Sequence, residues 1–186
     1  KRTLFVLLSA APSLLLPTIR SRCRRLDLAP LAGEPLRKAA EAALAAAEME
    51  APDAEAWHRL EALAQGSVRR ALQLTASGGI ELYGRIEAIF SSLPGLDWQA
   101  AHALAEQMGY GAPEQRYQTF YELFTDLLQR LVRAAATGEG TSAETALAAR
   151  LIPHHRLPAW AAFWQKVLAD KADADELNLD RKALIT

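Results

Sequence analysis

The chain has 186 residues, of which 51% are hydrophobic, and its 21 basic and 22 acidic side chains leave a net charge of −1. This balance argues against a nucleic-acid binder that works through bulk positive charge, so any DNA contact is expected to be local or made by partners. A single cysteine, Cys23, excludes an internal disulfide and a multi-cysteine zinc module, and is ordinary for the reducing cytoplasm. No stretch approaches about 18 uninterrupted apolar residues, so no membrane span is expected.

The first 29 residues predict a small α/β region. Thr3 to Ser9 is a continuous apolar run of strand length, typical of a buried parallel strand. Ser13 to Ser21 predicts a short helical turn, and Arg24 to Leu28 a second strand. Without neighbouring strands, Leu4 to Leu8 would be an exposed edge that favours self-pairing.

Arginines gather around Ser21-Arg22-Cys23, at positions 20, 22, 24 and 25. Arginine carries a planar, permanently charged fork that suits phosphate oxygens. An arginine placed in trans at a neighbour's nucleotide can stabilise the charge of phosphoryl transfer. The residues alone also fit a simpler interpretation, a solvated basic turn, because charge runs usually solvate a surface.

After Pro30 the pattern predicts helices throughout. The first runs from Glu34 to Met49, and Pro52 breaks it. Asp53 is a good N-cap for a helix over Ala54 to Gln65, whose apolar stripe comprises Trp57, Leu60, Leu63 and Ala64. Gly66 ends this helix, and Ser67 can cap a third over Val68 to Ala76.

A further helical bundle is predicted from Gly79 onward. Its expected helices are Ile80 to Leu93, Trp98 to Met108 with Asp97 as cap, Glu114 to Ala136, a helix that reaches about Ile152 behind the capping box of Thr141 and Glu144, and Pro158 to Ala169. The apolar and aromatic stripes on these helices favour core packing over base stacking. On the long helix the stripe is Tyr117, Phe120, Tyr121, Phe124, Leu127, Leu128 and Leu131; on the last it is Trp160, Phe163, Trp164, Val167 and Leu168.

The usual signatures of nucleotide chemistry are missing from the sequence. It has no G-x-x-x-x-G-K-[ST] phosphate loop, no G-x-G-x-x-G and no acidic cluster after an apolar strand. His154 and His155 are adjacent and would point in different directions on a helix, so no metal site is predicted there. The chain alone is not expected to hydrolyse ATP.

Two segments carry a resemblance to a known family. Leu14 to Cys23, LLLPTIRSRC, resembles the SRC motif of bacterial clamp-loader subunits of the AAA+ superfamily. Leu63 to Leu72, LAQGSVRRAL, resembles the sensor 2 segment of the same proteins, in the same order and at the same spacing. Within that superfamily the chain is most similar to the delta-prime family of DNA polymerase III, and Leu177 to Lys182 resembles its C-terminal part.

The resemblance implies a C-terminal fragment with three regions. Residues 1–29 would be the end of the AAA+ nucleotide domain, 30–78 the helical lid and 79–186 the helical collar. Arg22 would be an arginine finger that reaches ATP and magnesium bound by the neighbouring subunit, and Arg69 a sensor 2-like phosphate contact on the lid. Ser9 would occupy the sensor 1 position as a substitute, since the neighbouring Ala10 is not polar.

The same resemblance implies a role in replication at the bacterial cytoplasmic, nucleoid-associated replisome. The partners would be the gamma/tau and delta subunits, with the sliding clamp and primer–template DNA reached through the complex. The chain would assist ATP-dependent loading of the clamp onto primed DNA, bind no cofactor itself and contact no membrane. No catalysis is expected of it alone, although the holoenzyme is a DNA-directed DNA polymerase, a nucleotidyltransferase.

Two alternatives remain open at this point. A gamma/tau ATPase subunit shares both motifs and would require a phosphate loop upstream of Lys1. A helical adaptor without AAA+ ancestry would use the arginine run to bind an acidic partner, and would tolerate Arg22→Lys. For Arg69, the matching alternative is a solvated helix arginine near a cap.

Overall fold

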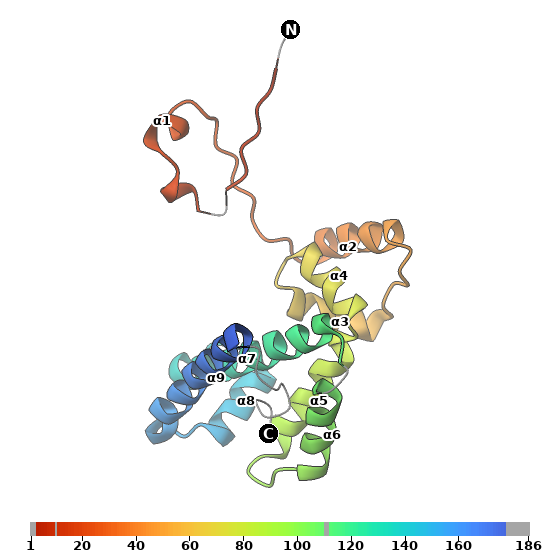
Figure 1. Cartoon of the computed structure of the whole chain (residues 1–186), viewed down its shortest axis with the longest axis vertical. Helices are drawn as coiled ribbons and strands as arrows, with labels where there is room; N and C mark the ends of the chain where they lie inside the picture. Colours follow the sequence, from red (N-terminus) through yellow and green to blue (C-terminus); the bar gives the residue numbers. More distant parts are fainter. Residues whose placement is uncertain (1–2, 10, 110–111, 178–186) are drawn as a thin grey trace. The chain divides into compact units, whose positions relative to one another are not determined.

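The computed structural model describes residues 3–9, 11–109 and 112–177. The chain divides into two compact units, Lys1–Pro30 and Leu31–Thr186. Within the described ranges the regular secondary structure is entirely helical, which confirms the prediction of a mainly α chain (Figure 1). Apart from Pro30, the regions predicted at 30–78 and 79–186 both belong to the second unit.

The first unit contains two short helical elements, η1 (Pro12–Leu14) and α1 (Pro17–Arg20). Each has proline in its first turn, where the missing N–H group would have had no helical partner in any case. Both lie within or beside the turn predicted over Ser13 to Ser21, and Leu15 separates them in extended conformation.

The two predicted strands are absent from the described part of this unit, so the predicted α/β region is not formed. Residues 4–8 are between 60% and 88% exposed, and Leu26 and Leu28 are exposed as well. A strand requires a neighbour for its N–H and C=O groups, and an apolar parallel strand also requires layers on both faces. In the described unit the apolar run is therefore neither a strand nor buried, in contrast to the prediction.

The second unit begins with three helices: α2 (Glu34–Ala46), α3 (Ala54–Ala64) and α4 (Val68–Ala76). They pack against one another, and the buried face of α3 is the predicted stripe of Trp57, Leu60, Leu63 and Ala64. The predicted caps are confirmed: Asp53 accepts a hydrogen bond from the Ala56 N–H at 2.8 Å, and Ser67 accepts one from the Arg70 N–H at 3.3 Å. Helix α2 ends three residues before the predicted Met49.

Five further α-helices complete the described part of the unit: α5 (Gly79–Ser92), α6 (Trp98–Met108), α7 (Glu114–Thr137), α8 (Ser142–Leu151) and α9 (Leu157–Leu177), with η2 (His154–Arg156) before the last. The caps at Asp97 and at Thr141 with Glu144 form as predicted. Helix α9 extends eight residues past the predicted end at Ala169. Of the C-terminal segment singled out above, Leu177 ends α9, and residues 178–182 lie outside the described residues.

Helix α7 lies at the centre of this unit, in contact with α5, α6, α8 and α9. The predicted stripe on α7 is buried except for Phe124, which is partly buried. A single apolar cluster runs from Leu36 on α2 through α4 and α5 to Ile152 after α8. The helices α2–α4 and α5–α9 form one compact unit because side chains from both groups belong to the same apolar core.

The connection between α4 and α5 depends on two glycines. Gly78 has a φ of +66°, in the left-handed region that glycine adopts without strain. A Cβ on Gly79 would lie 2.7 Å from Leu74 Cδ2 and 3.1 Å from the Leu74 carbonyl oxygen, so the helices can approach closely only with glycine there. Gly78 caps α5 and Gly79 is its first residue.

Candidate functional site

The turn that carries Ser21-Arg22-Cys23 follows directly from the end of α1. The Ser21 N–H donates to the Pro17 carbonyl at 2.9 Å, and the Arg22 N–H donates to the Ile19 carbonyl at 3.1 Å. The Ser21 hydroxyl donates to the Thr18 carbonyl at 3.2 Å. These bonds satisfy carbonyls at the helix end, so the backbone at Arg22 is held by α1 while its side chain is exposed.

The arginine run presents its charge to solvent. Arg20, Arg22, Arg24 and Arg25 are all exposed. Arg25 Nε lies 2.6 Å from Asp27 Oδ1, whereas Arg22 has no ion pair within the described ranges. An exposed guanidinium without an internal partner is chemically able to form a bidentate contact with phosphate or carboxylate oxygens.

Two other candidate residues of the first unit, Cys23 and Ser9, are also exposed. Cys23 carries an exposed free thiol. The Ser9 hydroxyl, at the predicted sensor 1 position, is exposed and accepts a hydrogen bond from the Ala11 N–H at 3.3 Å. Ala10 lies outside the described residues. Ser9 is therefore engaged locally, with no described contact to Arg22.

The start of α4 forms as a capped helix N-terminus. Gln65 adopts the left-handed conformation and Gly66 has a φ of +80°, which reverses the chain between α3 and α4. Ser67 then accepts the Arg70 N–H, and Arg69 lies in the first turn with its side chain exposed. A helix N-terminus with an adjacent guanidinium favours anions through both its free N–H groups and its charge.

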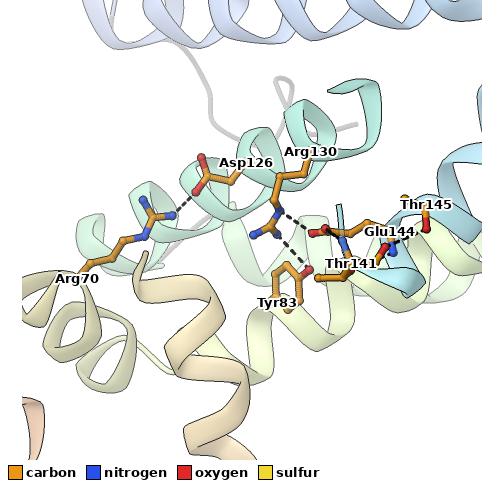
Figure 2. Close-up of polar contacts among 7 residues, drawn as sticks. All are labelled: Arg70, Tyr83, Asp126, Arg130, Thr141, Glu144 and Thr145. Carbon is orange, nitrogen blue, oxygen red and sulfur yellow. Dashed lines mark hydrogen bonds and ion pairs between the residues drawn. The ribbon is translucent and has the colours of Figure 1, made fainter. Parts of the chain in front are cut away.

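Arg70, the residue after Arg69, is less exposed than Arg69, and the sequence did not indicate this difference. Arg70 is about one-quarter exposed and forms an ion pair with Asp126 of α7, as Figure 2 shows. The two residues are 56 positions apart. Since no local pattern links residues at this separation, only the tertiary structure could reveal the contact.

A second group of polar residues joins α5, α7 and α8 (Figure 2). Arg130 donates from Nη2 to the Tyr83 hydroxyl at 3.1 Å, and its Nε lies 3.0 Å from Glu144 Oε1. The other oxygen of Glu144 accepts the Thr141 N–H at 3.0 Å, so the capping carboxylate also serves the ion pair. Burial raises the pKa of the Tyr83 hydroxyl, and the nearby Arg130 charge opposes that shift.

A lysine joins α9 to α7 in a similar way. Lys171 Nζ lies 5.2 Å from the ring centroid of Tyr117 and 5.3 Å from that of Tyr121, and it pairs with Asp175. A cation at such distances from aromatic faces is attracted by their quadrupoles. Burial, with smaller effects from Tyr117, Asp170 and Asp175, raises the pKa of Tyr121. This cluster is best explained as structural, because it fixes one helix on another.

A surface pocket of about 230 Å³ lies between α2 and α3. His58 is exposed and lines it with Trp57 and Glu61. Glu61 accepts the Gly33 N–H at 2.6 Å, and Arg37 stacks 5.6 Å from the Trp57 ring centroid while bonding Glu41 at 2.9 Å. Arg37 and Glu61 at this pocket thus have protein partners already.

The structure places the predicted site residues in two groups. Arg22 and Ser9 belong to the first unit, and Arg69 belongs to the second, beside Arg70. His154 and His155 lie in η2, exposed. Among the described residues, no group of three or more His, Cys, Asp or Glu side chains could hold a metal ion. Within the same residues, no helix is both long and apolar enough to cross a membrane.

In comparisons with known proteins, the chain matches no family model, no curated protein and no solved structure.

Proposed function

We propose that this chain acts as a delta-prime-type subunit of a DNA polymerase III clamp loader, in the bacterial cytoplasm. In this role it assists ATP-dependent loading of the sliding clamp onto primed DNA. Arg22 reaches the ATP and magnesium held by an adjacent gamma/tau subunit, and the helices of residues 79–186 contribute to the collar with gamma/tau and delta. Arg69 is a candidate phosphate contact at its own lid.

The observation that carries the proposal is Arg22, which is exposed and has no ion pair among the described residues, in a motif held by the end of α1. A finger that acts in trans must be available on the free subunit, since an arginine already paired inside its own chain would have to break that pair to reach a neighbour. The arrangement Ser21-Arg22-Cys23 satisfies this requirement within the described ranges.

The second support comes from the start of α4. The segment that resembles sensor 2 folds as a glycine turn, a serine cap and an exposed Arg69 in the first helical turn. This is the local geometry in which a phosphate contact is physically reasonable. The uniformly helical composition of α2–α9 also agrees with a lid followed by a collar.

The test is the ATPase of a reconstituted clamp loader that contains the intact subunit. Arg22→Ala is expected to lower the clamp- and DNA-stimulated rate by about tenfold or more, because a trans arginine stabilises the transition state of phosphoryl transfer. Assembly, measured by size-exclusion chromatography, should be unchanged because Arg22 is exposed. An unchanged ATPase rate in a properly assembled complex would refute the finger assignment.

Two control variants sharpen the result. Arg24→Ala removes an equally exposed charge two residues away and should leave the ATPase rate nearly unchanged. Arg22→Lys keeps the charge but loses the bidentate fork, so it should behave like the alanine variant. If Arg22→Lys and Arg24→Ala both behave like wild type, the basic run is better explained as an adaptor surface for an acidic partner.

Partner choice is tested separately by mixing the protein with gamma and delta subunits from the same organism. A discrete hetero-oligomer on size-exclusion chromatography would support the proposed collar. Failure of the intact subunit to assemble with either partner would count against the whole proposal. It would leave the helical adaptor as the better explanation of the fold.

A further inference from the structure

Helices α4 and α7 are joined by two polar contacts along one seam. Arg70 of α4 pairs with Asp126 of α7. The hydroxyl oxygens of Thr119 on α7 and of Ser77, the residue that follows α4, lie 3.2 Å apart. Ser77 and Thr119 are the two buried polar residues of the described chain.

The two contacts are in register. Arg70 and Ser77 are seven positions apart along the first helix, and Thr119 and Asp126 are seven positions apart along the second. Seven residues span about two turns, or about 10.5 Å of helix, so the contacts are evenly matched on both sides. The pairing of the end of α4 with the earlier position on α7 makes the two segments antiparallel.

Opening this seam would leave the Arg70 guanidinium and the Asp126 carboxylate without each other. Each hydroxyl has one proton and donates it within its own helix, Ser77 to the Gln73 carbonyl at 2.8 Å and Thr119 to the Gln115 carbonyl at 2.8 Å. The Ser77–Thr119 contact is therefore a close approach of two buried hydroxyls, and the Arg70–Asp126 pair is the stronger link of the seam. Arg70 Nε is buried without a hydrogen-bond partner among the described residues, so Asp126 is the main compensation for this guanidinium. Removing one partner of a largely desolvated ion pair costs more than the intact pair contributes.

We infer that Arg70–Asp126 and Ser77–Thr119 form a polar latch that fixes α4 against α7. The neighbouring Arg69 points outward because successive helical residues differ by about 100° in direction. Arg70 is thereby a positioning residue: its pair with Asp126 fixes the rotation of α4, and this rotation directs the Arg69 side chain toward solvent. The latch itself rests on the contacts above, and only its consequence for a phosphate at Arg69 rests on the proposed function.

The experiment is amide hydrogen exchange, followed by mass spectrometry, on the 186-residue chain. Arg70→Gln and Asp126→Asn should each speed exchange of peptides from 68–76 by about tenfold, while peptides from α8 change little. Lys166→Gln is the matched control, because it removes one positive charge from the exposed pair with Asp170 inside α9. It should leave exchange in 68–76 unchanged.

The exchanged pair, Arg70→Asp with Asp126→Arg, should restore protection of 68–76, which would not happen if each residue stabilised its own helix independently of the other. Equal acceleration in all helices of the single variants would overturn the latch, as would unchanged exchange in 68–76 or failure of the exchanged pair to restore it. These readouts need no nucleotide or partner subunit. The latch and the clamp-loader proposal can therefore fail independently.

Discussion

At the residue scale, the arginines of this chain differ mainly in what surrounds them. Arg22 is exposed and internally unpaired within the described ranges, whereas Arg130 is only 16% exposed and pairs with Glu144, which is 14% exposed. Arg130 also lies 5.6 Å from the centroid of the Tyr83 ring. One side chain therefore satisfies a carboxylate, a phenol and an aromatic face contributed by two other helices.

Replacing Arg130 tests how much this cluster contributes to stability. Arg130→Ala should lower the free energy of unfolding by about 2–4 kcal/mol, because it leaves the Glu144 carboxylate largely buried without its partner. Urea denaturation followed by circular dichroism measures the change. Arg133→Ala, on an exposed position of the same helix, should cost less than about 1 kcal/mol. Equal losses in the two variants would show that the cluster adds no stability.

At the element scale, the apolar periodicity of α9 predicts a helix but does not predict which face of that helix packs on the core. The predicted stripe of five apolar residues exists, but its members divide between two faces. Trp160, Trp164 and Val167 pack on the core, while Phe163 is 46% exposed and Leu168 is exposed as well. The helix is apolar nearly all round, so sequence alone does not decide which side contacts α7.

Two variants of α9 test this orientation. Trp164→Ala should lower the free energy of unfolding by about 2–4 kcal/mol, since it removes a ring packed on the core. Phe163→Ala, the neighbouring position, should cost about 1 kcal/mol or less because much of that ring already contacts water. Thermal and urea unfolding of the two variants give the comparison. A larger loss for Phe163→Ala would mean that α9 is rotated from the orientation described.

At the scale of the whole molecule, the two units differ in how their backbones are held. In Lys1–Pro30 the arginine run lies at and after a four-residue helix, with its side chains exposed. In the second unit the arginines of α2–α8 lie on helices of nine residues or more that share one core. Resistance to proteases follows burial and hydrogen bonding of the backbone.

Limited digestion with trypsin should reflect this difference. The first internal products should begin at Ser21, Cys23, Arg25 or Leu26, before any cut after an arginine of α2–α8 appears. Mass spectrometry of a time course identifies the products, and circular dichroism should show that the remaining fragment keeps its helices. Early cleavage after Arg116 or Arg133 would contradict the assignment of α7 to the stable core.

Sequence by itself determined the helices of the second unit and most of their ends. The caps at Asp53, Ser67, Asp97 and Thr141 are local interactions within three residues, and the stripe on α7 has the helical period, so both can be read from neighbouring positions. The candidate residues Arg22 and Arg69 likewise came from local motifs, and their proposed roles await experiment.

Tertiary structure decided what depends on residues far apart in the chain. The apolar run over Thr3 to Ser9 forms no strand, because strand formation depends on a partner that the described unit does not provide. The Arg70–Asp126 pair, the Ser77–Thr119 contact and the Arg130 cluster join positions separated by 56, 42 and 47 residues in their main contacts. Whether an arginine contacts solvent or a buried carboxylate is set by helix packing, and packing has no local signature in the sequence.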